Sequence, residues 1–178
     1  MLGGAKPGRR VAIRMDEKRK LLRHFLAAIA YRTQKALRGA PSDFASFQAG
    51  RSVRTPYELI THMDSVLGYA RTFFIGGAYR PPELPDFQAA VNHFHETLKD
   101  LARHLQSGTD FREITPEKML QGPFSDVMTH AGQLAMLRRM HGSPVPSENF
   151  IYAEVNADNL GPEQPLPARP DEDWTPRV

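Results

Sequence analysis

The stretch FQAAVNHFHETLKDLARHL, residues 87–105, gives the clearest indication of the fold. Its apolar side chains recur three and four residues apart, and they are Phe87, Ala90, Val91, Phe94, Leu98, Leu101 and Leu105. This spacing places them on one side of an α-helix, with the polar residues on the other side. The pattern predicts an amphipathic helix that packs against other helices and ends at Ser107 and Gly108.

The same helical period occurs in three further segments of the chain. The predicted helices run from Asp16 to the residues before Gly39, from Pro56 to Phe74, from Phe87 to Ser107, and from Gly122 to Gly142. Thr55 followed by Pro56 is a typical helix start, because threonine caps the first turn and proline fits its first position. Thr115 and Pro116 indicate a short additional turn before the last helix.

Four amphipathic helices with few strand signals predict an all-α fold, a four-helix bundle. We interpret residues 1–14, which are glycine-rich and basic, as a flexible arm, with Met15 as an alternative start of the native chain. Residues 15–155 form the predicted bundle domain. The proline-rich and acidic residues 156–178 are predicted to form an extended tail.

Composition narrows the classes of function. The chain has no cysteine, so disulfides, thiolate metal sites and a cysteine nucleophile are excluded, and the strong metal ligands left are His, Asp and Glu. No apolar run approaches the roughly 18 residues of a membrane span, and the first residues lack a secretory signal. We therefore expect a cytoplasmic protein with no membrane partner.

Charge and motifs exclude further classes. Basic residues concentrate in residues 1–40 and acidic residues in residues 148–178, but the basic segment matches no nucleic-acid motif. We expect no nucleic-acid partner, and we interpret the basic residues as a solvated helix surface. The sequence also contains no nucleophile elbow and no glycine-rich phosphate loop.

The last predicted helix carries polar groups on the side expected to face the core. Asp126 and His130 lie one turn apart, so their side chains project together. A buried carboxylate is costly unless it is paired or binds a metal, which makes a metal site the first hypothesis. His62 borders the apolar side of the predicted helix 56–74 in the same way. The alternatives are a hydrogen-bonded core histidine and, for Asp126, an acid favoured by the helix dipole.

The other histidines are expected to be half-exposed surface groups, because they lie beside the apolar stripes; they are His24, His93, His95, His104 and His141. Gln133, one turn beyond His130, is either a contact of the site or a helix-packing amide. Arg138 and Arg139 are expected to be solvated in the last turn of their helix, where their positive charges interact favourably with the helix dipole. We expect Tyr69, on the His62 side, to be an aromatic of the core or its rim.

Two segments resemble the DinB-like (damage-inducible) superfamily. HAGQLAMLRRMHGSPVP, residues 130–146, is similar to the signature of that family's fourth helix, and TPYELITH, residues 55–62, is similar to its second helix. The resemblance extends over residues 16–155. It implies a four-helix bundle in which one residue of the second helix and two of the fourth hold a divalent metal.

Carried over to this chain, the implied ligands are His62, Asp126 and His130. The family usually has histidine where this chain has Asp126. Carboxylate is a competent ligand, so the resemblance implies a two-histidine, one-carboxylate site for zinc or nickel, with iron or manganese as alternatives. The opposing interpretation is that Asp126 marks a degenerate site that no longer binds metal.

Three protein ligands leave an open position, which is typical of a catalytic site. The resemblance implies a metal-dependent enzyme, either a low-molecular-weight-thiol S-transferase or a metal-water hydrolase. Two other classes remain open: a non-catalytic protein that binds a metal or small ligand, and an oligomeric interaction protein with a degenerate site. The expected partners are a small thiol or another small-molecule substrate, and a second copy of the chain in a homodimer.

Overall fold

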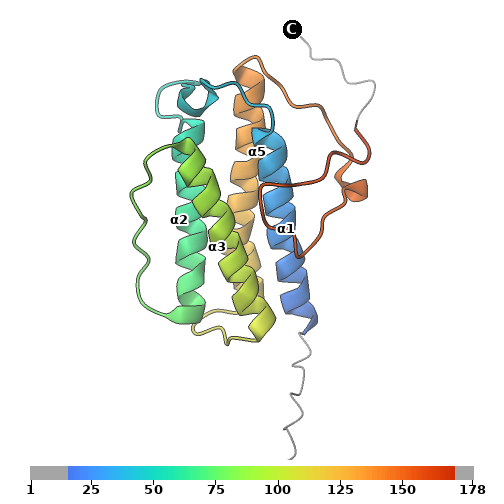
Figure 1. Ribbon diagram of the computed structural model, residues 1–178. Helices are drawn as coiled ribbons and strands as arrows, with labels where there is room; N and C mark the ends of the chain where they lie inside the picture. Colours follow the sequence, from blue (N-terminus) through green and yellow to red (C-terminus); the bar gives the residue numbers. More distant parts are fainter. Residues whose placement is uncertain (1–15, 171–178) are drawn as a thin grey trace, which may run out of the picture.

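Four long helices lie side by side (Figure 1). The computed structural model describes residues 16–170, and in them these helices are α1 (Glu17–Leu37), α2 (Pro56–Ile75), α3 (Phe87–Ser107) and α5 (Ser125–Met140). Helix α1 packs against α3 and α5, and α2 packs against the same two helices. The described residues contain an isolated β-bridge but no strand, so the fold is all-α, as predicted.

The apolar sides of the helices meet in one core. Its largest fully buried side chains include Tyr31, Phe44, Phe94 and Phe124, which come from four different helical segments. Burying one such side chain is worth about 1.5 to 3 kcal/mol, so this core is the main source of stability. Within residues 16–170, no helix combines the length and apolar character needed to cross a membrane.

The predicted ends of α2 and α3 are confirmed within one residue. The Thr55 hydroxyl accepts from the Glu58 backbone N–H, and the Glu58 carboxylate accepts from the Thr55 backbone N–H. This capping box satisfies two backbone donors that the helix itself leaves without partners. Helix α3 ends at Gly108, whose φ of 76° lies in the left-handed region where glycine is favoured.

The fourth long helix begins earlier than predicted. A single turn, α4 (Pro116–Met119), continues through a π-helical segment, η2 (Leu120–Phe124), directly into α5. Pro123, next to the predicted start at Gly122, lies inside this continuous helix. The wider π turn accommodates a residue that cannot donate a backbone hydrogen bond. The Ser125 hydroxyl donates to the Leu120 carbonyl oxygen at 2.7 Å and satisfies it.

After α5 the chain returns along α1 (Figure 1). It contains the short 3-10 helix η3 (Phe150–Tyr152). The buried Glu148 carboxylate accepts from the Tyr31 hydroxyl at 2.6 Å and pairs with Lys35 at 2.8 Å, both on α1. The predicted arm, residues 1–14, and the end of the predicted tail, residues 171–178, lie outside the described residues.

His95 is buried, so the prediction of a surface position for it was wrong. Its side chain lies under the returning chain, where Nδ1 is 2.7 Å from the Leu160 carbonyl oxygen. That carbonyl can only accept, so Nδ1 carries the ring proton. The other ring nitrogen, Nε2, is buried without a hydrogen-bond partner. A protonated ring would therefore place a charge where nothing accepts its second hydrogen.

Stability should fall as the pH drops below about 6.5, the ordinary pKa of histidine. Burial lowers the pKa of His95 in the folded protein below its value in the unfolded chain. At a pH between these two pKa values, the unfolded chain binds more protons than the folded one. The free energy of unfolding then decreases with decreasing pH. Urea titrations at pH 7.5, 6.5 and 5.5 should show this loss of stability. In His95→Gln the free energy of unfolding should change less with pH, so its slope against pH should be smaller. Equal slopes for wild type, His95→Gln and the exposed control His24→Gln would contradict the prediction.

Candidate metal centre

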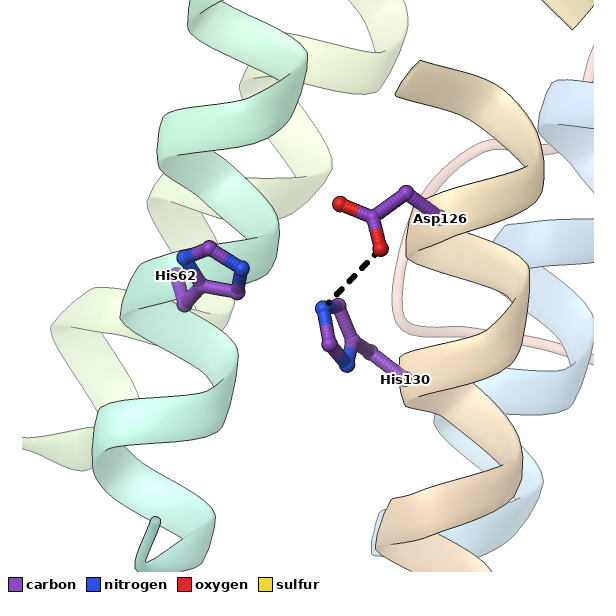
Figure 2. Close-up of side chains that lie close together, drawn as sticks. All are labelled: His62, Asp126 and His130. Atoms are coloured by element: carbon purple, nitrogen blue, oxygen red, sulfur yellow. Dashed lines mark ion pairs between the residues drawn. The ribbon is translucent and has the colours of Figure 1, made fainter. Parts of the chain in front are cut away.

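The three predicted ligands come together between α2 and α5 (Figure 2). His62 projects from α2 toward α5, and Asp126 and His130 project from successive turns of α5 toward α2. One possible ligand atom from each residue lies within 4.8 Å of the other two. The two imidazole rings pack edge-on, with their centroids 4.8 Å apart and their planes at 71° to each other. Side chains from two separate helices therefore lie close enough together to form one site.

His130 is held in a defined orientation. Its ring is buried, and Nδ1 lies 2.8 Å from the Gln133 amide oxygen one turn further along α5. Because that oxygen accepts, the hydrogen bond places the ring proton on Nδ1 and leaves a lone pair on Nε2. Fixing a ligand histidine through its other nitrogen is a common feature of metal sites. Gln133 therefore acts as a contact of the site.

The Nε2 atom of His130 is buried and forms no hydrogen bond. Asp126 Oδ1 lies 3.3 Å from it, as the dashed line in Figure 2 marks. A lone pair facing a carboxylate oxygen is repulsive, so a cation is favoured here: either a proton on Nε2, which makes an ion pair with Asp126, or a metal ion between the two atoms. This pair of atoms is consequently a place where a positive ion is stabilised.

The spacing of this pair fits a metal ion. Two ligands that bind a tetrahedral ion at about 2.0–2.1 Å lie roughly 3.3 to 3.4 Å apart. The distance from His130 Nε2 to Asp126 Oδ1 falls in this range. The third candidate ligand, His62, is half-buried and offers a ring nitrogen within 4.8 Å of ligand atoms of the other two residues. The donor set of two nitrogens and one oxygen suits zinc, nickel, iron and manganese.

Asp126 differs from the expectation of a buried acid, because its side chain is 49% exposed. Asp126 lies in the first turn of α5, just after the π-helical segment. It is the most exposed of the three residues, so water solvates part of its carboxylate. Its presence on this side of α5 therefore does not by itself require a metal. The buried Nε2 atom of His130, which has no hydrogen-bond partner, is the stronger indication of a site.

The electrostatics of His62 favour the neutral ring. Burial lowers its pKa below the ordinary value, the positive charge of Arg54 lowers it further, and Asp126 opposes them. A neutral imidazole offers a lone pair, which is the form that binds a metal. At pH 7 the ring is thus ready to act as a ligand.

Arg138 is a buried structural residue, so the prediction that it is solvated was wrong. Its guanidinium donates to the carbonyl oxygens of Ala36, Arg38 and Gly39 at the end of α1, at 2.9 to 3.3 Å. It also donates to Ser143. Arg138 therefore joins the end of α1 to the end of α5 and takes no part in the metal centre. Its neighbour Arg139 is exposed.

Tyr69 is 54% exposed and packs on Phe73, with ring centroids 5.0 Å apart. It lies at the rim rather than in the core, and together with Asp126 it lines a shallow pocket on one side of the cluster. Among the histidines set aside, His24 is exposed, whereas His93, His104 and His141 are partly buried.

A second polar cluster, which no sequence pattern indicated, lies on the opposite side of α2. The fully buried Asp64 carboxylate accepts from the Tyr79 hydroxyl at 3.1 Å, from His93 Nδ1 at 2.8 Å and from the Thr97 hydroxyl at 2.7 Å. Spacing could have revealed that His93 and Thr97 share a side of α3. Tyr79 lies in a loop, where no period exists to show its direction.

Comparisons with protein-family models, with curated proteins and with solved structures find no match to this chain.

Proposed function

We propose that this protein is a DinB-like four-helix bundle that binds one divalent metal ion through His62, Asp126 and His130. The observation that carries the proposal is the buried Nε2 atom of His130, which has no hydrogen-bond partner and lies 3.3 Å from a carboxylate oxygen. The order of the four helices and the residues that resemble the family support the same assignment.

The ligand set favours zinc or nickel, with iron and manganese as the alternatives. Two imidazoles suit the first pair, and the carboxylate makes the site harder and more negative than three histidines would. Such sites discriminate poorly between these ions by affinity alone. The ion present in the cell therefore depends on availability as well as on the ligands.

We propose that the site is enzymatic and belongs to a low-molecular-weight-thiol S-transferase or a metal-water hydrolase. When bound, a divalent ion lowers the pKa of a coordinated water or thiol and so provides a nucleophile near neutral pH. Three protein ligands leave room for such a molecule. The half-exposed Asp126 keeps the site open to solvent, and Gln133 holds the buried His130 in place.

Metal content tests the proposal. After chelation and reloading with zinc or nickel, the wild-type protein should hold about one ion per chain by elemental analysis. His130→Ala should hold almost none, and Gln133→Ala should bind about tenfold to hundredfold more weakly, because its amide orients the ligand. Asp126→Ala should also bind more weakly, and since this residue is half exposed the variant should fold normally.

The exposed His24 provides the control, because His24→Ala removes an imidazole remote from the cluster and should leave metal content unchanged. Circular dichroism of each variant separates loss of metal from loss of fold. Negligible metal in both wild type and His130→Ala, with no change in melting temperature on adding zinc or nickel, would overturn the proposal. It would favour an interaction protein with a degenerate site.

A further inference from the structure

A second pocket lies beside the metal centre, between the loop that precedes α2 and the last turns of α5. Its volume is about 600 Å³, and its lining includes Val53, Arg54, Leu59, Gln133, Met136 and Met140. Gln133 connects this pocket with the metal centre: it lines the pocket, and its amide oxygen lies 2.8 Å from His130 Nδ1. The pocket therefore adjoins the proposed metal site.

The wall of this pocket is apolar and accessible. Met136 is 60% exposed, Met140 is 54% exposed and Val53 is 43% exposed, although side chains of this kind are usually buried. Methionine side chains are flexible and polarisable, so they adapt to apolar ligands of different shapes. A ligand that covered them would remove apolar surface from water and gain the corresponding free energy.

The positively charged residue in the lining of this pocket is Arg54. Arg54 is exposed and lines the pocket, and within residues 16–170 it forms no hydrogen bond or ion pair. Arg54 lines the same pocket as Gln133, whose amide oxygen contacts His130, so the cation lies next to the proposed metal site. A planar guanidinium with all its donors available is well suited to bind a carboxylate through two parallel hydrogen bonds.

The loop that carries Arg54 is anchored to α5. Phe44 in this loop is fully buried, and the His141 ring packs edge-on against Phe44 and Phe47 with centroids 5.7 and 5.0 Å away. Ser52 has a φ of 62°, a left-handed conformation that a serine adopts at a cost of about 1 kcal/mol. Such strain is found at sites where the backbone must present a side chain in a fixed direction.

We propose that this pocket binds the substrate of the metal centre, and that the substrate is an amphipathic organic acid with one carboxylate and an apolar chain of several carbon atoms. The chain lies on Met136 and Met140, and the carboxylate pairs with Arg54. The inference rests on the proposed function for the role of the ligand as a substrate. The pairing of an apolar wall with a single available cation selects the ligand class.

Binding of octanoate to the full chain tests the pocket directly, measured by calorimetry with and without one equivalent of zinc. Octanoate should bind about fivefold to tenfold more tightly than 1-octanol, because one accessible charge-assisted pair is worth about that factor. Acetate, which has the charge without the chain, should not bind measurably. Arg54→Gln should reduce octanoate affinity to that of the alcohol, and Met136→Gln should weaken both ligands.

Arg51→Gln is the matched control, because Arg51 is an exposed arginine of the same loop that does not line the pocket. It should bind octanoate like the wild type. Equal affinity of wild type and Arg54→Gln, or octanoate binding no tighter than octanol, would overturn the proposed ligand class.

Zinc content of the same samples separates this inference from the proposed function. Arg54→Gln should retain the zinc of the wild type, because Arg54 is not a ligand. Octanoate binding that depends on Arg54 in a protein that holds no zinc would support the pocket and overturn the metal centre. Zinc binding without octanoate binding would support the metal centre and overturn the pocket.

Discussion

Replacing Arg138 with methionine is expected to lower the free energy of unfolding by about 3 to 5 kcal/mol, because several buried carbonyl oxygens lose their donor and each unsatisfied buried group costs about 1 to 3 kcal/mol. The guanidinium is 5% exposed and donates to three carbonyl oxygens at the end of α1. Methionine fills a similar volume but has no donor. The carbonyl oxygens that a helix end leaves without partners would then be buried unsatisfied.

Urea unfolding followed by circular dichroism measures this change. Arg138→Lys should recover only a small part of the loss, because an ammonium group cannot reach acceptors spread around a planar guanidinium. The comparison is Arg103→Met on α3, whose side chain is 72% exposed and pairs with Asp100 at the surface. That variant should change stability by less than about 1 kcal/mol. Similar losses for Arg138→Met and Arg103→Met would show that the buried network contributes little.

Replacing Asp64 with alanine is the second change with a large expected effect, a loss of about 2 to 4 kcal/mol. The carboxylate is completely buried and accepts hydrogen bonds from Tyr79, His93 and Thr97. Alanine would leave these donors without an acceptor and open a cavity beside α2. Because Tyr79 lies in the loop between α2 and α3, we also expect that loop to become accessible to protease.

Two further variants test the cause of the Asp64 effect. Tyr79→Phe removes one of the three hydrogen bonds and keeps the ring, so it should cost about 1 kcal/mol. Gly68→Ala adds a Cβ atom that would lie 2.3 Å from the Tyr79 ring, so the ring must move and its hydrogen bond must break. We expect Gly68→Ala to cost about 1 to 3 kcal/mol, the range for overpacking. A larger loss for Tyr79→Phe than for Asp64→Ala would contradict the proposed network.

The positions of the helices depended mainly on local signals. Thr55 caps α2 through contacts within three residues, and the apolar period of residues 87–105 reports which side of α3 is buried without reference to any other helix. Pro123 shows where such signals are ambiguous. Proline is favoured at a helix start, but here a π turn and the Ser125 hydroxyl allow the helix to continue through it.

The candidate site was only partly predictable. Spacing brought Asp126 and His130 to one side of a helix and placed His62 beside the apolar side of another, and the family resemblance joined the three as ligands. The exposure of Asp126 could not be predicted, because it depends on how closely α2 and α5 approach each other at that level. The surroundings of His95 could not be predicted either, since the carbonyl that accepts from it belongs to Leu160, 65 residues away.

The amino-acid sequence by itself determined the all-α class, the ends of α2 and α3 and the alignment of Asp126 with His130, because each depends on contacts within a few residues. The tertiary structure decided which polar groups have partners. Arg138 and Asp64 are satisfied by distant segments, whereas Nε2 of His130 has no hydrogen-bond partner beside a carboxylate. The physical reason is that a side chain's hydrogen-bonding needs are local, but the atoms that meet them come from whichever element packs against it.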